Sequence, residues 1–286
     1  MIDIASFPVQ KELIDLLYKE KICSLKDLNF PVSPGQFFQL FSPCTPKNKT
    51  LVYSSHNSLK LADTWKGKTL NGFQPKDCKQ LVYFNQLEED SFVITAALGA
   101  AGTGKTTIAL AKALTDYFKI KRKVILCKPT AMVQSGINNA FGPVPGDLNE
   151  KYAPYISSFE IILKKILGKG SSAYFQTMLQ KKDIEFIPVE FTRGCTFEDC
   201  TFILDEAQNL TWHELKTVMS RIGSNSQLIL CGDPDQIDSG FYYKDSGLYK
   251  LLSSTTFTQS EFTTHIHLTK QYRGKIPDLI YHIDKE

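Results

Sequence analysis

The sequence predicts an α/β fold in which a mostly parallel sheet is covered by helices on both faces, with a small N-terminal extension. From about residue 72 onward, short apolar runs alternate with helical patterns, and each run ends in turn residues. Continuous apolar runs are typical of strands buried on both faces, whereas strands with one wet face alternate apolar and polar residues. The six runs are 91–99 (SFVITAALG), 123–128 (KVILCK), 184–191 (IEFIPVEF), 200–206 (CTFILDE), 227–233 (QLILCGD) and 265–269 (HIHLT).

The composition is that of an ordinary globular chain with one large or two small domains. Its 286 residues are 42% apolar and 22% charged, and the net charge is only +3, so any nucleic-acid surface has to be local. The seven cysteines are scattered, without the paired spacing of a zinc site. The sequence has neither a signal-peptide pattern nor an apolar run of membrane-spanning length. We therefore expect reduced thiols, no membrane partner and a cytoplasmic location, in a host's cytoplasm if the gene is viral.

Residues 1–70 form the predicted extension, and residues 71–286 form the main domain. Leu13, Leu16 and Leu17 recur at helical spacing, and four prolines and a glycine between residues 31 and 46 then interrupt the pattern. The sequence indicates no function for this segment.

A glycine-rich turn follows the first apolar run. It has the pattern Gly-x-x-x-x-Gly-Lys-Thr, and the helical pattern behind it has Ile108, Ala111 and Leu114 on one face. Glycines let successive backbone N–H groups turn toward one anion, and the next helix adds its positive end. The turn predicts a phosphate loop, with Lys105 on the β and γ phosphates and Thr106 on Mg²⁺. Its predicted cofactor-binding residues are Gly99, Ala100, Ala101, Gly102, Thr103, Gly104, Lys105, Thr106 and Thr107.

Two adjacent acids, Asp205 and Glu206, end the fourth run. Neighbouring carboxylates repel each other and are costly to desolvate, so the pair is either a solvated turn or a site for a cation. A Mg²⁺ held by Thr106 and two phosphates would be that cation. We predict that Asp205 holds the metal through water and that Glu206 polarises the attacking water. A capping box from Thr211 to Glu214 starts a helix directly behind the acids.

The fifth run ends in the turn GDPDQ, residues 232–236. A neutral amide near the γ-phosphate can detect it or orient water without changing the charge around the metal. Gln236 is the residue predicted for this role, with Asp233 positioning it. An ordinary polar turn is the alternative.

In their order along the chain, these segments resemble the PhoH-like P-loop ATPases, a family related to superfamily 1 helicases. The resemblance covers about residues 72–280, and the order is more specific than any single motif. The segments that carry it are 72–80 (GFQPKDCKQ), 99–106 (GAAGTGKT), 144–155 (VPGDLNEKYAPY), 191–209 (FTRGCTFEDCTFILDEAQN), 220–238 (SRIGSNSQLILCGDPDQID) and 267–273 (HLTKQYR).

The resemblance implies a RecA-like P-loop fold, ATP hydrolysis with Mg²⁺, and action on nucleic acid, with RNA favoured over DNA. It also implies that Gln80 reads the adenine and that Arg273 contacts the γ-phosphate. Arg193 and Arg221 lie in two of the family segments and are candidate arginine fingers, with a structural role at a strand or helix end as the alternative. The predicted catalytic residues are Lys105, Glu206, Gln236 and Arg273.

The chain departs from the family pattern in three respects. Cys195 stands where family members usually carry an arginine, which puts a role for that position in doubt. Some relatives have a nuclease domain ahead of the ATPase, but no strand-plus-aspartate start opens residues 1–70, so we expect no nuclease activity. Superfamily 1 helicases also have a second lobe after the QYR segment. A single lobe cannot close on itself, so we expect a homo-oligomer, such as a hexameric ring, to complete the site.

Three residues are predicted to contact nucleic acid. Lys128 and Thr130 follow a strand in the segment CKPTA and resemble the superfamily 1 segment that grips a strand backbone. Lys151 lies near aromatic residues that could stack on bases, although a place in the core is the alternative for the two tyrosines. These aromatic residues are Tyr152, Tyr155 and Phe159.

The leading hypothesis is a Mg-dependent ATPase that couples turnover to binding, remodelling or unwinding of RNA or single-stranded DNA. An ATP-gated oligomeric scaffold without unwinding and a small-molecule kinase that uses the same loop are the alternatives. The kinase hypothesis lacks an evident acceptor pocket. Stimulation of ATP hydrolysis by nucleic acid separates the leading hypothesis from the scaffold.

Overall fold

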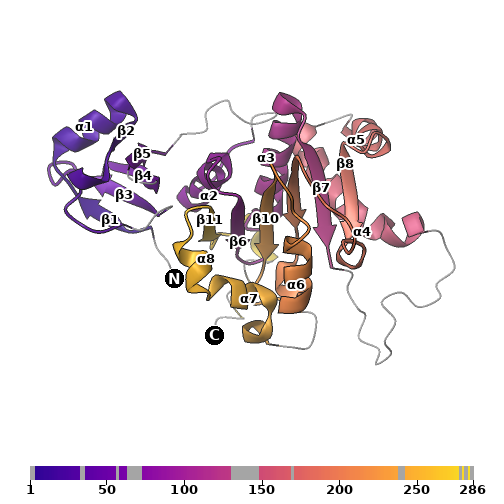
Figure 1. Cartoon of the computed structure of the whole chain (residues 1–286). Helices are drawn as coiled ribbons and strands as arrows, with labels where there is room; N and C mark the ends of the chain where they lie inside the picture. Colours follow the sequence, from indigo (N-terminus) through magenta and orange to yellow (C-terminus); the bar gives the residue numbers. More distant parts are fainter. Residues whose placement is uncertain are drawn as a thin grey trace.

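The strands form two sheets, one of five strands near the N-terminus and one of six strands in the rest of the chain. The computed structural model describes residues 4–32, 36–55, 58–62, 73–129, 148–168, 171–237, 242–276, 279 and 283. Figure 1 shows the two sheets side by side, with one helix, α2, between them.

The six-stranded sheet confirms the predicted fold class. Its strands are β6 (Ile94–Leu98), β7 (Lys123–Lys128), β8 (Ile184–Pro188), β9 (Cys200–Leu204), β10 (Gln227–Gly232) and β11 (Thr263–His267). They follow the order β11-β6-β10-β9-β7-β8, and every pairing between these strands is parallel. Each strand overlaps one of the six predicted runs. Because β10 lies between β6 and β9, the carboxyl ends of these three strands meet at one edge of the sheet.

Helices cover both faces of this sheet, as the sequence predicts (Figure 1). One face carries α2 (Cys78–Glu88), α3 (Lys105–Ile120), α4 (Leu148–Leu167) and α5 (Ser171–Gln180), and the other carries α6 (Trp212–Met219), α7 (Gly247–Leu252) and α8 (Thr255–Gln259). In β9, Ile203 packs on the first group of helices, and Phe202 and Leu204 pack on the second. Successive side chains of a strand point to opposite faces, so a strand with apolar residues on both faces needs cover on both sides.

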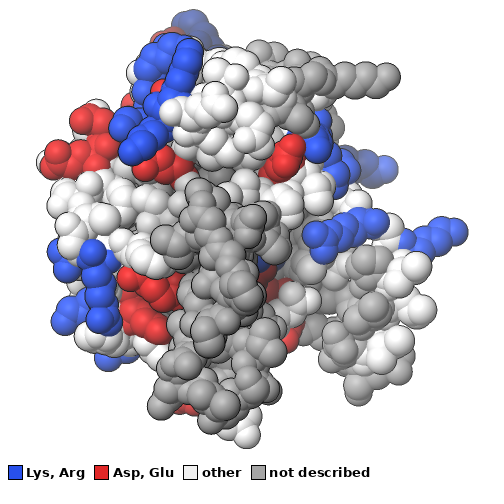
Figure 2. Space-filling model, turned by 90° about the vertical axis from the view of Figure 1, so that its right-hand side faces the viewer, with Lys and Arg blue, Asp and Glu red and all other residues white. Residues whose placement is uncertain are grey.

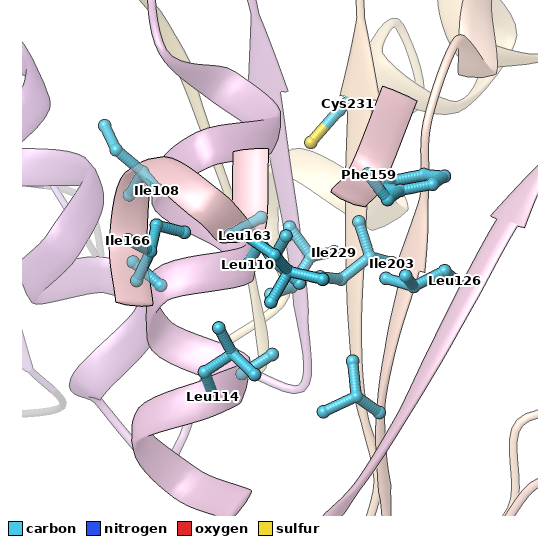
Figure 3. Close-up of a cluster of buried hydrophobic side chains, with 14 of the residues drawn as sticks. Ile108, Leu110, Leu114, Leu126, Phe159, Leu163, Ile166, Ile203, Ile229 and Cys231 are labelled. Carbon is cyan, nitrogen blue, oxygen red and sulfur yellow. The ribbon is translucent and has the colours of Figure 1, made fainter. Parts of the chain in front are cut away.

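The larger core lies between the sheet and helices α3 and α4 (Figure 3). Leu110 and Leu114 of α3 and Leu163 of α4 pack with Ile203 and Ile229 of the central strands, and all five are fully buried. Burying such a side chain contributes about 1.5–3 kcal/mol. This packing holds α3 on the sheet, beside the edge where the strands end.

Short elements connect the main ones. The predicted capping box at the start of α6 is present, since Thr211 Oγ1 accepts the N–H of Glu214 at 3.3 Å and the Glu214 carboxylate accepts the N–H of Thr211 at 2.9 Å. The described 3₁₀ helices are η1 (Leu25–Asp27), η3 (Val189–Phe191), η4 (Ala207–Asn209) and η5 (Tyr243–Asp245). Within the described ranges, no helix combines the length and the apolar character needed to cross a bilayer.

The N-terminal residues form a small sheet of their own, with the predicted helix α1 (Lys11–Glu20) packed on one face. The strands are β1 (Ser6–Pro8), β2 (Ile22–Ser24), β3 (Phe37–Phe41), β4 (Lys49–Ser55) and β5 (Ser58–Leu61), in the order β1-β3-β4-β5-β2. These strands were not predicted, because most of them are short and follow proline-rich or polar segments. The first sheet ends at Leu61 and the second begins at Ile94; the division at about residue 70 stays a prediction.

The N-terminal sheet contacts both ends of α2. Gln39 donates to the Cys78 sulfur at 3.6 Å at the start of the helix. At its other end, Tyr53 donates to Glu89 at 2.6 Å, and Lys60 forms an ion pair with the same carboxylate at 3.1 Å. Burial pushes the pKa of Glu89 up, but the bonds from Tyr53 and Lys60 outweigh it, so the pKa lies below its ordinary value.

Glu89→Gln is expected to lower the free energy of unfolding by about 1 kcal/mol at pH 7, because the ion pair with Lys60 is lost. A depressed pKa adds stability above the unfolded-state pKa, and this stability disappears as the pH falls through the folded-state pKa. The difference between wild type and variant should therefore close below about pH 4. Denaturant unfolding at several pH values measures it. Asp90→Asn, at an exposed neighbouring carboxylate, is the control and should change the free energy of unfolding at pH 7 by less than about 0.5 kcal/mol.

Candidate active site

The candidate site lies where β6, β10 and β9 end. Leu98 of β6 pairs with Gly232 of β10, and Leu204 of β9 pairs with Leu230 of β10. This register sets the three carboxyl ends nearly level, which is where ligands of open α/β sheets bind. Residues 99–104 follow β6, residues 233–237 follow β10, and residues 205–206 follow β9.

The glycine-rich loop has backbone conformations that glycine adopts readily. Gly99, Gly102 and Gly104 have φ angles of 140°, 85° and 99°, in a region that residues with a Cβ rarely enter. A Cβ on Gly99 would lie 2.1 Å from the carbonyl oxygen of Leu268. Helix α3 begins directly behind the loop, and its first turn has backbone N–H groups without a partner inside the helix. The loop therefore leads into the N-terminus of α3, and helix N-termini favour anions.

Lys105, the first residue of α3, reaches back over the loop. Its ammonium group donates to the carbonyl oxygens of Gly99 and, at 3.1 Å, of Ala100. Neutral carbonyls are weaker partners for an ammonium group than charged oxygens are. An anion in the loop would thus be the better partner for Lys105.

The loop and the acid pair are in direct contact. The Thr106 hydroxyl donates to the carboxylate of Asp205 at 2.8 Å. Burial raises the pKa of Asp205 and the charge of Glu206 raises it further, while Lys128, the hydrogen bond from Thr106, and Lys105 oppose the rise. On balance the pKa of Asp205 is raised, so its half-buried carboxylate has less positive charge around it than it needs to stay ionised easily.

Glu206 is held in an unusual conformation. Its φ of 56° and ψ of 38° are left-handed, which costs about 1–3 kcal/mol for a residue other than glycine and persists where surrounding contacts hold it. Gln208 donates to its Oε2 at 2.8 Å, and Lys128 forms an ion pair with its Oε1 at 3.6 Å. Both carboxylate oxygens thus have a defined partner.

The turn after β10 completes the site. The N–H of Asp233 donates to Gln208 Oε1 at 3.0 Å, and the carbonyl of Gln236 accepts from Gln208 Nε2 at 2.8 Å. Burial raises the pKa of Asp233, whose Oδ1 accepts the N–H of Asp235 at 3.1 Å. Its Oδ2 is buried without a hydrogen-bond partner among the described residues. The side chain of Gln236 is exposed.

A further wall of the site comes from the start of α2 and from the segment after β11. Gln80, 4% exposed, donates to the carbonyl of Thr103 at 2.8 Å and accepts the N–H of Lys76 at 2.8 Å. The N–H of Tyr272 donates to the carbonyl of Gly102 at 3.0 Å. Arg273, the next residue, lies against the same glycine, with its side-chain carbons 3.0–3.2 Å from the position of an added Cβ. The structure therefore brings Gln80 and Arg273 to the loop.

Residues 73–283 match the family described as "PhoH-like protein". The chain belongs to this family. It is 33% identical to "Protein PhoH2" of Bacillus subtilis (strain 168), over 58% of this chain and 38% of the relative. It is also 33% identical to the "PhoH-like protein" of the same strain, over 67% of this chain and 57% of that relative. It is 35% identical to "Protein PhoH" of Escherichia coli (strain K12) over 56% of this chain and 43% of the relative. The matches thus span 38% to 57% of these relatives' own lengths.

Among solved structures, the PhoH-like chain is similar to a Pif1 helicase from Candida albicans. The TM-score is 0.38 and the identity 18%, and the match covers 74% of this chain and 44% of the helicase chain.

Among the described residues, neither candidate arginine finger forms a hydrogen bond or an ion pair with the loop. Arg193 is exposed between β8 and β9. Arg221 follows α6, and its carbonyl accepts the N–H of Phe197 at 2.8 Å just ahead of β9. Since α6 runs back from the carboxyl end of β9, Arg221 lies at the opposite edge of the sheet. Its Nε is buried without a partner among the described residues.

The predicted nucleic-acid contacts have different outcomes. Lys128 ends β7, and its side chain is 23% exposed beside Glu206. Thr130 and the side chain of Lys151 lie outside the described part of the chain, as do the side chains of Tyr152 and Tyr155. The stacking role considered for Phe159 is wrong, because its ring is 1% exposed and packs in the core of Figure 3. Figure 2 shows the described Lys and Arg side chains of one face in separate groups, with acids between them.

Sequence reasoning missed two residues of the site, Gln208 and Tyr272. Gln208 connects the segments after β9 and β10, and Tyr272 donates to Asp77 at 2.6 Å at the N-cap of α2. Both lie inside the family segments DEAQN and KQYR, next to residues that were singled out. Their position in those segments is the signal that could have found them.

Gly99→Ala is expected to abolish nucleotide binding by the loop, because the new Cβ collides with the Leu268 carbonyl. Gly194→Ala is the matched control: its φ is 83°, and nothing lies within 4 Å of the added Cβ. That variant should lose only about 1–2 kcal/mol of stability to backbone strain. Titration with a fluorescent ATP analogue, together with thermal unfolding, measures both effects. Equal binding by the two variants would contradict this loop geometry.

Proposed function

We propose that this PhoH-like protein binds ATP with Mg²⁺ at the edge formed by β6, β10 and β9, and hydrolyses it. The observation that carries the proposal is the 2.8 Å hydrogen bond from Thr106 of the loop to Asp205 of the acid pair. Phosphates in the loop would then lie next to a hydroxyl and a carboxylate, the two side-chain groups that a Mg²⁺–phosphate complex uses.

Residues 99–107 would bind the phosphates, and Lys105 would exchange its two carbonyl partners for phosphate oxygens. Gln80 is the proposed adenine contact. Its amide already bonds Thr103 and Lys76, one hydrogen bond at each end. A side-chain amide has two donors and two acceptor positions, so one of each is left for the base.

Thr106 and Asp205 are the residues proposed to hold the metal. When bound, Mg²⁺ neutralises charge on the phosphates and favours their attack by water. The hydroxyl and the carboxylate are already within hydrogen-bond distance, and hard oxygen ligands of this kind suit Mg²⁺.

Glu206 is the proposed acceptor of the proton from the attacking water. Its Oε2 is held by the buried Gln208, whereas its Oε1 faces the partly exposed Lys128 at 3.6 Å. Oε1 is therefore the oxygen that becomes accessible to water when the ion pair with Lys128 separates. The exposed amide of Gln236 would orient this water or detect the γ-phosphate, and Arg273 would supply positive charge beside Gly102.

We further propose that ATP hydrolysis is coupled to the binding of nucleic acid, with RNA favoured over single-stranded DNA. We also propose that the protein acts as a homo-oligomer such as a hexameric ring. Lys128 supports the first part, because a phosphate backbone that binds its ammonium group would compete with Glu206. For the second part, Arg221 and Arg193 are the residues proposed to act in the site of a neighbouring subunit.

Lys105→Ala is expected to weaken ATP binding strongly, and Glu206→Gln to keep binding but lower kcat by about 10²–10⁴-fold, the usual range for loss of a general base. Steady-state ATPase with a parallel ATP titration separates the two effects. Lys119→Ala, exposed at the far end of α3, and Glu198→Gln, exposed ahead of β9, are controls expected to resemble wild type. Equal rates for wild type, Lys105→Ala and Glu206→Gln would end the proposal.

Lys128→Ala is expected to reduce the stimulation of ATPase activity by RNA. The control is Lys123→Ala, an exposed lysine at the other end of the same strand. Wild-type ATPase is titrated with RNA, single-stranded DNA and duplex at two salt concentrations, since phosphate contacts weaken with salt. If no nucleic acid stimulates the enzyme, but ATP changes its oligomeric state in light scattering, the scaffold alternative is correct.

A further inference from the structure

Gln208 is a buried glutamine whose side chain connects two strand ends of the candidate site. It lies in η4, directly behind the acid pair, and none of its surface is exposed. We infer that Gln208 is a positioning residue for the hydrolysis proposed above: it holds the Glu206 carboxylate in a fixed relation to the turn that carries Gln236. The inference rests on the proposed function and deepens it.

The amide of Gln208 makes three hydrogen bonds. Its Nε2 donates to Glu206 Oε2 at 2.8 Å and to the carbonyl of Gln236 at 2.8 Å, and its Oε1 accepts the N–H of Asp233 at 3.0 Å. Both N–H groups are used and the oxygen has one partner. Only a primary amide offers two donors and an acceptor in one plane. A carboxylate cannot donate, and an apolar side chain of the same length would remove all three hydrogen bonds, including the one to the buried N–H of Asp233.

The backbone around Gln208 makes room for this arrangement. A Cβ on Gly232, the last residue of β10, would lie 3.3 Å from Gln208 Oε1 and 2.5 Å from a methyl group of Leu248. A side chain at this position would therefore force the amide or α7 to move. Strand β10 therefore ends in a glycine at the point where the Gln208 amide comes close to its backbone.

Of the two partners of Glu206, Gln208 is the fixed one. Lys128 is 23% exposed and reaches Oε1 at 3.6 Å as an ion pair, which is a contact that opens easily in water. Gln208 is fully buried and is also bonded to the turn after β10. The carboxylate thus keeps its orientation through Oε2 while Oε1 becomes available to a water molecule.

The same amide connects the proposed base to the proposed γ-phosphate sensor. The turn is closed by the N–H of Gln236, which donates to the carbonyl of Asp233 at 3.1 Å, and Gln208 bonds the backbone of both residues. A shift of the turn would therefore change the position of Glu206 through a single side chain.

The test compares ATP hydrolysis by wild type, Gln208→Met and Gln208→Glu. Gln208→Met has nearly the same length and no hydrogen bonds. Its kcat should fall about 10²-fold, the effect of a misplaced reacting group, with ATP affinity unchanged because the phosphate loop is intact.

Gln208→Glu keeps the length of the side chain and an acceptor oxygen, but a carboxylate has no N–H to donate to Glu206 or to the carbonyl of Gln236. Its kcat should therefore fall as in Gln208→Met, with ATP affinity unchanged. A purely structural role predicts a loss of stability without this split between kcat and affinity. If Gln208→Met does not fold by circular dichroism, the kcat and the ATP affinity of Gln208→Glu decide.

Gln227→Met is the matched control. Gln227 is 7% exposed at the other end of β10, and its amide donates to the carbonyls of Leu87 at 3.2 Å and Phe92 at 3.3 Å. This variant should lose stability but keep kcat. An active wild type with the same kcat in Gln208→Met and Gln227→Met overturns the role of Gln208 alone. A wild type that binds ATP without hydrolysing it overturns the proposed function and the role of Gln208 together.

Discussion

The contact between Thr106 and Asp205 depends on an order of strands that local sequence does not determine. The loop follows β6 and the acids follow β9, yet these two strands never pair, because β10 lies between them. Parallel pairing in a common register brings their carboxyl ends to one edge, and the hydroxyl and the carboxylate then meet at 2.8 Å. A different strand order would separate the two halves of the site by the width of further strands, about 4.8 Å each.

The core explains why the register is kept. Along β9, Phe202 and Leu204 face α6 and its neighbours, while Ile203 faces α3 and α4. A slip by one residue would exchange the two faces and bring each side chain into a core shaped for another. It would also move Asp205 along the strand direction by about 3.3 Å, which is more than the length of its bond to Thr106. Packing far from the edge of the sheet therefore determines the geometry of the site.

Features encoded over a few neighbouring residues could be predicted, and features that depend on distant pairs could not. The six strands, the glycine turn and the capping box of α6 are local, and all were predicted. The N-terminal sheet pairs Ser6 with Gln39 across a helix and a proline-rich segment, and nothing in either short strand indicates that partner. Gln208 is similar, since its partners Asp233 and Gln236 belong to the next strand connection. The core position of Phe159 was not predicted, because a helical aromatic residue near lysines suits a core as well as a surface.

The N-terminal sheet is physically connected to the candidate site through α2. The sheet contacts α2 at Cys78 and, just past its end, at Glu89. Between these contacts, in the first turn of the same helix, Gln80 donates to the carbonyl of Thr103 in the glycine-rich loop. A helix is stiff along its axis because each turn is bonded to the next. Movement of α2 along its axis would therefore strain the bonds to the sheet and the bond to the loop together, so the N-terminal sheet is mechanically part of the surroundings of the site.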